Sequence, residues 1–285
     1  MLLRPPAIAT PLARIWNFVF NVLCVAILAL LVSPLAVIIP LSFNAEPFFT
    51  FTPGMLSAEA SAYSLRWYEQ VLTDPQWRLA AWNSLFIGVA STALATTLGT
   101  WAALGMTQRR LPGHAIIMML LQAPMMAPIV IVAAAIYFFL VKIGLTQTLT
   151  GIVLAHTLLG SPFVVSTIVA TLSGFDRNLT RASLSLGASG ARTFFKVTLP
   201  LIWPGIFSGA LLAFVTSLDE VVVVLFLGGG DQRTLPLQMW SGLREQLSPA
   251  ILAAATMLMA LSIILLGVKE TLRRRSERLA LTNFS

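Results

Sequence analysis

Six long apolar segments dominate the pattern of hydrophobic and polar positions along the chain. Each holds 20 residues or more, enough to cross a hydrocarbon core of about 30 Å at 1.5 Å of helical rise per residue. A single span in lipid must satisfy its own backbone hydrogen bonds, so each segment is predicted to be a helix. The pattern predicts an all-α integral membrane protein with about six transmembrane helices. The segments are residues 15–41, 80–106, 115–141, 149–172, 205–227 and 249–268.

The composition supports a lipid environment. Hydrophobic residues make up 57% of the 285 positions and charged residues 10%, against about 25% charged residues in a typical soluble domain. The net charge of +7 comes without the clustered basic and aromatic pattern of a nucleic-acid surface, so no nucleic-acid partner is expected. Cys24 is the single cysteine, which excludes an internal disulfide.

The distribution of basic residues predicts the orientation in the membrane. Of the 18 lysines and arginines, 13 lie on the same side of the six segments as the N-terminus and 5 on the other. Because cytoplasmic loops are enriched in lysine and arginine, both termini are predicted to be cytoplasmic. Two loops are long enough to carry structure, an outer one at about 42–79 and an inner one at about 173–204.

The inner loop is predicted to form a helix–glycine–helix element. Thr180 is placed to cap a short helix ending near Leu186, and Gly187 is free to break it. A second helical piece is expected over residues 191–199, with Pro200 and Pro204 marking the turn into the fifth segment. A compact knob of this kind suits docking into a groove of another protein.

This loop resembles the "EAA" loop of permeases from ATP-binding-cassette (ABC) importers, which has the form E-A-A-x-x-x-G-x(9)-I-x-L-P. The resemblance implies a coupling loop at about 178–200 that inserts into an ATPase subunit. Arginine replaces the acid of the family pattern, a change that disfavours an ion pair with a basic residue on the ATPase. The matching residues are Arg181-Ala182-Ser183, Gly187, Val197 and Leu199-Pro200.

Other stretches resemble the polyamine (spermidine/putrescine) branch of the same importers, in its second-permease type. The similarity runs from about residue 20 to residue 270. It implies the type I ABC importer permease fold. The stretches are Ser42-Phe43-Asn44, SLRWY at 64–68, Trp82-Asn83-Ser84-Leu85, Ser217 to Val223 and Thr234-Leu235-Pro236-Leu237.

Asp219 and Glu220 are the only acidic residues inside an apolar segment. A carboxylate there costs several kcal/mol unless it is paired, hydrated or neutral, so the pair is a candidate for the translocation path or its gate. Adjacent helical positions point about 100° apart, so both acids are not expected to face one cavity. The alternative is that the pair joins neighbouring helices by hydrogen bonds. Gly228-Gly229-Gly230, just beyond, suggests a mobile gate.

The sequence contains none of the common phosphate-binding, zinc-protease or nucleophile-elbow motifs. No catalytic residue, no metal site and no cofactor bound by this chain are therefore expected. His156, in the fourth segment, is interpreted as a hydrogen-bonded packing residue rather than a proton carrier.

The resemblance divides the chain into a cytoplasmic tail (1–14), a transmembrane permease domain (15–272) and a second cytoplasmic tail (273–285). It implies a non-catalytic permease subunit in the bacterial inner membrane that forms half of the path for a small cationic solute, a polyamine such as putrescine or spermidine first. The implied partners are a second permease, two ATPase subunits that bind ATP and magnesium, a periplasmic substrate-binding protein and the lipid bilayer.

Three alternatives remain open from the sequence. In the first, the chain is an importer permease whose solute is an opine, an amino-acid-like cation or another small organic molecule. In the second, the chain is an ion-coupled transporter that works alone through Asp219, Glu220 or His156. In the third it is a membrane-embedded enzyme, for which the sequence offers no site.

Overall fold

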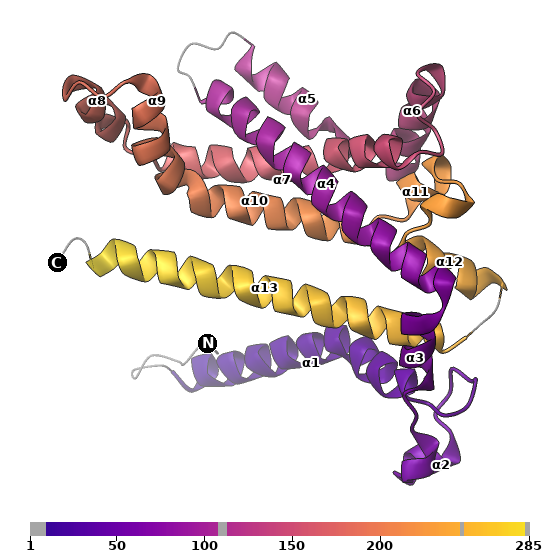
Figure 1. Ribbon diagram of the computed structural model, residues 1–285. Helices are drawn as coiled ribbons and strands as arrows, with labels where there is room; N and C mark the ends of the chain where they lie inside the picture. Colours follow the sequence, from indigo (N-terminus) through magenta and orange to yellow (C-terminus); the bar gives the residue numbers. More distant parts are fainter. Residues whose placement is uncertain (1–9, 108–112, 246–247, 283–285) are drawn as a thin grey trace. The chain divides into compact units, whose positions relative to one another are not determined.

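The computed structural model describes residues 10–107, 113–245 and 248–282, and this part of the chain is helical (Figure 1). Its only β pairing is a single bridge between Asn44 and Tyr63. Two 3₁₀ turns (Ala60–Ala62 and Gly230–Gln232) and one π-helical turn (Phe194–Thr198) interrupt the α-helices. The α-helices are α1 (Pro11–Ser42), α2 (Pro53–Leu56), α3 (Arg66–Thr73), α4 (Pro75–Met106), α5 (His114–Met126), α6 (Ile129–Lys142), α7 (Leu149–Ser173), α8 (Arg177–Ser185), α9 (Gly190–Thr193), α10 (Leu199–Asp219), α11 (Val222–Leu227), α12 (Leu235–Glu245) and α13 (Ala250–Thr282).

Within the described residues, five helices are long and apolar enough to cross a membrane, and the bent pair α5–α6 gives a sixth span if it is counted as one. The expectation of about six spans is therefore confirmed. The predicted C-terminal tail (273–285) continues α13 as a helix to Thr282, and residues 283–285 lie outside the described residues. Of the predicted N-terminal tail (1–14), residues 1–9 lie outside them and α1 begins at Pro11.

The third apolar segment is broken rather than merely kinked. The chain direction bends by 105° between its two halves, α5 and α6. The break follows from Pro128, because a proline disfavours helical backbone at the residue before it. Ala127 accordingly has extended backbone angles (φ −81°, ψ 147°). Pro124, in contrast, stays within α5.

The fifth apolar segment also differs from the prediction at both ends. The helix begins earlier, at Leu199, with Pro200 in its first turn and Pro204 inside it, so the predicted turn at these prolines is wrong. Proline is tolerated in a first turn, where its missing N–H would have no partner anyway. The helix ends at Asp219, and the short α11 follows after Glu220 and Val221.

The chain forms two compact units. The first contains the described residues up to Val71 together with 248–256, and the second contains those from Leu72 to Glu245 together with those from Met257 onward. In the first unit, none of the most apolar part of α1 is buried within the chain. A helix this apolar and unburied needs lipid or another protein around it.

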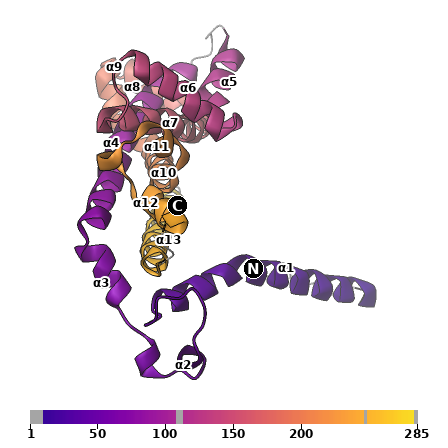
Figure 2. The same cartoon turned by 90° about the vertical axis from the view of Figure 1, so that its right-hand side faces the viewer.

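The second unit is built on α4, α7 and α10, which run side by side (Figures 1 and 2). Small residues let the helices approach closely, as is common in membranes. At Gly209 of α10, for example, an added Cβ would lie 2.9 Å from the Cα atom of Val164 in α7.

Two buried apolar clusters fill this unit. One is formed by α4, α6, α7, α11 and α12 around Ile152 and Val223. The other is formed by α4, α7 and α10 around Val164 and Ile202.

Candidate functional site

The loop predicted to couple to an ATPase, called the coupling loop below, begins with α8, whose first turn is capped by Asp176. The Asp176 carboxylate accepts the Asn178 N–H at 2.9 Å, so the predicted cap at Thr180 is wrong: Thr180 lies inside the helix. Gly187 ends the element in the left-handed region at φ +83°, as predicted. Its N–H donates to the Leu184 carbonyl, and the Leu186 N–H donates to the Ala182 carbonyl, each at 3.0 Å.

The second arm of the loop starts at Ser189, whose hydroxyl accepts the Arg192 N–H at 3.3 Å. From there α9, the π-helical turn and α10 follow one another directly. The predicted helical piece at 191–199 is therefore present, but it runs on into the fifth segment. A 3.0 Å hydrogen bond between the hydroxyls of Ser183 and the buried Thr193 joins the two arms.

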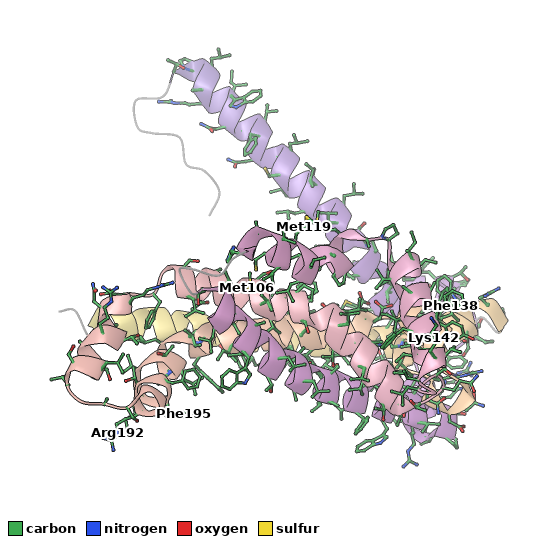
Figure 3. The ribbon with its side chains drawn as sticks, turned by 90° about the horizontal axis from the view of Figure 1, so that it is seen from above. Met106, Met119, Phe138, Lys142, Arg192 and Phe195 are labelled. Atoms are coloured by element: carbon green, nitrogen blue, oxygen red, sulfur yellow. The ribbon has the colours of Figure 1, made fainter. Side chains whose placement is uncertain are left out.

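The predicted coupling residues differ in their exposure. Arg181, Ala182, Gly187 and Pro200 are exposed, whereas Ser183 and Leu199 are half-buried, Leu199 against the second apolar cluster. The turn also presents apolar side chains, because Leu186 is 88% exposed and Leu184 is 48% exposed. On the second arm, Arg192 projects away from the ribbon and the neighbouring Phe195 is exposed (Figure 3).

Two contacts fasten the coupling loop to the helices of the second unit. The Arg177 guanidinium donates a hydrogen bond to the Thr107 carbonyl, at the C-terminal end of α4. Phe194 stacks on Trp101 of α4, with ring centroids 6.3 Å apart. These contacts connect the loop to α4, and the helix that follows it connects the loop to α10. Sequence reasoning missed the role of Arg177.

Asp219 and Glu220 lie at the break of the fifth segment. Glu220 has extended backbone (φ −79°, ψ 120°), and its carboxylate accepts the Val223 N–H at 2.9 Å, in the first turn of α11. Asp219 is the last residue of α10 and is exposed, and no described residue pairs with its carboxylate. Glu220 therefore has a backbone partner, whereas Asp219 has none within the part of the chain that the structure describes.

The position of Asp219 is unfavourable for helix stability. The C-terminal end of a helix carries a partial negative charge, and an additional carboxylate there is repelled. The same two negative charges attract a cation, as the C-terminal ends of broken helices do in other transporters. Helix stability thus gives no reason for an acid at this position, whereas cation attraction does.

A buried polar layer lies close to the break: on α4 and α10 its residues fall between those of the two apolar clusters, and on α7 its residue falls among those of the first. His156 Nδ1 and the Ser217 hydroxyl are 2.7 Å apart, and the Ser91 hydroxyl donates to that of Ser217 at 3.4 Å. His156 is 2% exposed. The layer joins α4, α7 and α10, which agrees with the interpretation of His156 as a hydrogen-bonded packing residue.

The segment after α11 is held against the start of α4. The Asn83 side chain is 2% exposed and donates to the carbonyls of Asp231 and Arg233 at 2.8 and 2.9 Å. The Ser84 hydroxyl accepts the Leu235 N–H at 2.8 Å. Two stretches identified by resemblance, at 82–85 and 234–237, are thus neighbours in the fold. The suggested mobile gate at Gly228 to Gly230 stays a prediction, and the residues that follow it, Asp231, Arg233 and Leu235, are tethered to the start of α4.

The outer loop of the first unit is organised around Asn44, which is fully buried. Its side chain donates to the Phe48 and Thr50 carbonyls and accepts the Glu46 N–H. Its carbonyl accepts the Trp67 indole N–H at 2.7 Å. The stretches at 42–44 and 64–68, both identified by resemblance, therefore form one structure.

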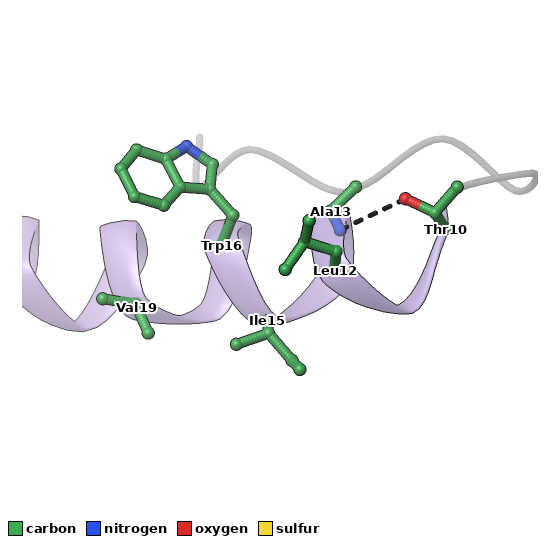
Figure 4. A pocket seen from close by; sticks show the side chains of 6 residues that line it. All are labelled: Thr10, Leu12, Ala13, Ile15, Trp16 and Val19. Atoms are coloured by element: carbon green, nitrogen blue, oxygen red, sulfur yellow. Dashed lines mark hydrogen bonds between the residues drawn. The ribbon is translucent and has the colours of Figure 1, made fainter.

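The hollows in the described residues include an apolar one and a polar one. The apolar one, on the first turns of α1, is lined by side chains of a single helix region from Thr10 to Val19, with Thr10 capping Ala13 (Figure 4). The polar one lies beside α8 and is lined by Leu172, Ser173, Phe175, Asp176, Arg177, Asn178 and Arg181. Asp219 and Glu220 line neither hollow. The described residues contain no cluster of acids, histidines or cysteines able to hold a metal ion.

Comparisons with known proteins place the chain in a family. Residues 95–278 match the family described as "Binding-protein-dependent transport system inner membrane component". The spermidine/putrescine transport system permease protein PotC of Escherichia coli K12 is 30% identical over 249 residues, which are 87% of this chain and 91% of that protein. PotC of Haemophilus influenzae is 29% identical, covering 91% of this chain and 98% of the relative.

The putrescine transport system permease protein PotI of E. coli K12 is 31% identical over 236 residues, which are 80% of this chain and 81% of that protein.

Solved structures show the same fold. A bacterial ABC transporter that imports the acidic polysaccharide alginate has a chain with a TM-score of 0.69 and 16% identity, covering 95% of this chain and 99% of that one. The MetNI methionine ABC transporter, in an inward-facing conformation, gives a TM-score of 0.58 and covers 71% of this chain and 98% of that one. The predicted type I ABC importer permease fold is confirmed.

The family match covers more than half of the chain and includes the predicted coupling loop, the acidic pair, His156 and Ser217. A membrane component of a binding-protein-dependent system is not an enzyme, and it does not work as an ion-coupled transporter on its own. The chain belongs to the family of inner membrane components of binding-protein-dependent transport systems, and it is a multi-pass ABC importer permease.

Proposed function

We propose that this chain is one of two permease subunits of an ABC importer for a small cationic amine, with putrescine or spermidine as the first candidates. The observation that carries the proposal is the 29–31% identity to PotC and PotI, named as spermidine/putrescine and putrescine permeases, over 80–91% of this chain. The free Asp219 at the negative end of α10 supports a cationic solute.

The proposed partners are a second permease, two ATPase subunits that bind ATP and magnesium, and a periplasmic protein that delivers the solute. An alginate importer has been solved in complex with a periplasmic protein, which supports the last of these for a chain of this fold. In the proposed orientation both termini and the coupling loop are cytoplasmic, as the distribution of lysine and arginine predicts. The coupling residues are Arg181, Ala182, Ser183, Gly187, Leu199 and Pro200.

The arrangement of the second unit suits an importer in which an ATPase drives transport through the permease. The coupling loop lies at one end of α7 and α10, and α11 and α12 lie at the other (Figure 1). The 21 residues of α10 span about 31 Å at 1.5 Å per residue. The continuous helix from α9 to Asp219 therefore links the site of ATPase docking to the site of solute attraction.

Transport by the reconstituted system tests the function. The chain is co-expressed with its second permease and ATPase, and uptake of labelled putrescine and spermidine into proteoliposomes is measured with the binding protein outside. Uptake is expected with the intact ATPase and is expected to stop with an ATPase that cannot hydrolyse ATP. Uptake that continues with the inactive ATPase would contradict the mechanism. ATP-dependent uptake of neutral or anionic solutes instead would contradict the substrate class.

A further inference from the structure

The tip of the coupling loop combines exposed apolar side chains with unpaired cations. Leu186 is 88% exposed, Leu184 48% and Phe195 64%. Arg181 on α8, Arg192 on α9 and Lys196 on the π-helical turn are exposed on the same loop. Exposed apolar side chains with charged residues on the same element are typical of a surface that another protein covers.

The charges near the tip are not balanced within the loop. Between residues 173 and 204 the sequence has four basic side chains and one acidic one, Asp176. Asp176 caps α8 through the Asn178 N–H, and Arg177 donates to the Thr107 carbonyl. The three remaining cations have no carboxylate partner among the described residues. The loop therefore presents a cationic rim to whatever it contacts.

We propose that the ATPase groove that receives this loop has an acidic rim and an apolar floor. The inference rests on the proposed function and adds the chemistry of the partner. Leu186 and Leu184 fill the floor, and Arg181 pairs with an aspartate or glutamate of the ATPase. Complementary charges increase the rate of encounter and penalise wrong partners.

Arg181 departs from the family pattern, and this departure indicates the charge of the partner. The family pattern has an acid at this position, and a groove built for that acid repels an arginine. Like charges brought together at an interface cost several kcal/mol. The arginine thus favours a cognate ATPase with the opposite charge and excludes ATPases of importers that keep the acid.

An anionic membrane surface is the other possible partner of a cationic loop. The structure favours a protein, because a helix lying on a membrane needs a continuous apolar face. Here the apolar tip residues are interrupted by small and polar positions, namely Ser185 and the stretch from Gly187 to Gly190. The two arms form a hairpin joined by the Ser183–Thr193 hydrogen bond.

A carbodiimide cross-link tests for the acid directly, since the reagent joins an amine to a carboxylate in contact with it. The Arg181→Lys variant supplies the amine in the assembled transporter. The expected result is an amide bond from position 181 to an aspartate or glutamate of the ATPase, identified by mass spectrometry. Absence of this bond in the assembled complex would overturn the proposal.

Charge reversal gives an independent measurement. Arg181→Glu is expected to weaken binding of the ATPase subunit to the permease pair by tenfold or more at low salt. The difference should shrink at high salt, because salt screens exposed charges. The control is Arg244→Glu, the same change at an exposed arginine of α12, which should leave ATPase binding unchanged. Unchanged or tighter binding of Arg181→Glu would overturn the proposal.

A photo-cross-linking residue at Leu186 separates failure of this inference from failure of the proposed function. If the ATPase is captured at position 186 but Arg181→Glu binds it as well as wild type does, the docking role of the loop is retained. Only the proposal that the groove is acidic is then contradicted. Capture of lipid in place of the ATPase would contradict both the acidic groove and the proposed function, because the coupling loop would then lie on the membrane.

Discussion

At the scale of single residues, two adjacent acids have different environments. Glu220 accepts the Val223 N–H at the start of α11, whereas Asp219 is exposed at the end of α10. The argument from helix geometry, that the two point about 100° apart, assumed a continuous helix and does not apply. What separates them is the break itself, at which the Glu220 side chain replaces a partner that the helix would have supplied.

Removing the charge of Asp219 is predicted to impair transport of a cationic amine. Asp219→Asn should lower the uptake rate at limiting solute about tenfold or more, which corresponds to a loss of about 1.4 kcal/mol of interaction. Assembly with the partner subunits should be retained, because the side chain is exposed. The matched control is Glu220→Gln, whose amide oxygen still accepts the Val223 N–H. Equal uptake by wild type and Asp219→Asn would remove Asp219 from the path.

Gly187 is predicted to matter for its backbone alone. An added Cβ would meet no atom within 4 Å, but φ is +83°, a region that costs most residues about 1 kcal/mol or more. Gly187→Val should therefore lower the amount of solute imported per ATP, and Gly187→Asn should do so less, since asparagine tolerates this region better.

Gly190→Ala is the control for Gly187. An added Cβ meets no atom within 4 Å there either, and the backbone of Gly190 is helical rather than left-handed. A Gly187→Val variant that imports as much solute per ATP as the control would contradict the proposed role of the turn.

At the scale of elements, two of the six apolar segments are broken. The break at Pro128 has a visible cause in the sequence, although its size of 105° does not. The break at Glu220 has no glycine or proline. The signal available was an acid followed by Val221 to Val224, because β-branched residues lose rotamer freedom in a helix. α11 is stabilised instead by burial of Val223, Val224 and Leu227.

Asn83 is predicted to hold the segment 231–235 in place. Asn83→Asp should destabilise the protein more than Asn83→Ala, because a carboxylate would face two carbonyl oxygens. The alanine variant leaves both carbonyls without their partner, at about 1–3 kcal/mol for each buried group. Thermal unfolding in detergent measures the order, and Ser84→Ala, which loses a single hydrogen bond, should have the smallest effect. An Asn83→Ala variant as stable as wild type would refute the tether.

Gly209 is predicted to set the distance between α7 and α10. A Cβ at this position would lie 2.9 Å from the backbone of Val164, which cannot move aside as a flexible side chain can. Gly209→Ala should therefore lower the unfolding temperature in detergent, with an overpacking cost of about 1–3 kcal/mol. Gly267→Ala in α13, where nothing lies within 4 Å, should not. Equal unfolding temperatures for the two variants would show that the helices separate easily.

At the scale of the whole molecule, the second unit places the two proposed functional sites at opposite ends of α10. The coupling loop precedes the helix and Asp219 ends it. Residues 42–71 of the outer loop belong to the first unit and have their own buried centre at Asn44. The proposed orientation assigns the coupling loop to the cytoplasm and the outer loop to the periplasm.

Cysteine labelling in intact cells checks this orientation. In a Cys24→Ser background, Leu186→Cys and Leu56→Cys introduce thiols at positions that are 88% and 76% exposed. A membrane-impermeant thiol reagent should label the variant at position 56 and should label that at position 186 only after the cells are broken. Labelling of position 186 in intact cells would reverse the orientation and contradict the docking of a cytoplasmic ATPase.

The membrane class, the number of spans and the turn at Gly187 could be predicted from the amino-acid sequence alone. These features depend on local quantities, namely the length of apolar runs and the backbone preference of one residue. The resemblance of the coupling loop to an importer permease also came from the sequence, and the family match confirms it.

The tertiary structure decided what depends on partners distant along the chain. The Asn83 side chain donates to the carbonyls of residues 231 and 233, and the His156 ring is hydrogen-bonded to the Ser217 hydroxyl. The end of the fifth helix at Asp219 was decided in the same way, because the packing of α11 against α6 and α7 stabilises a break that local preference alone leaves undetermined.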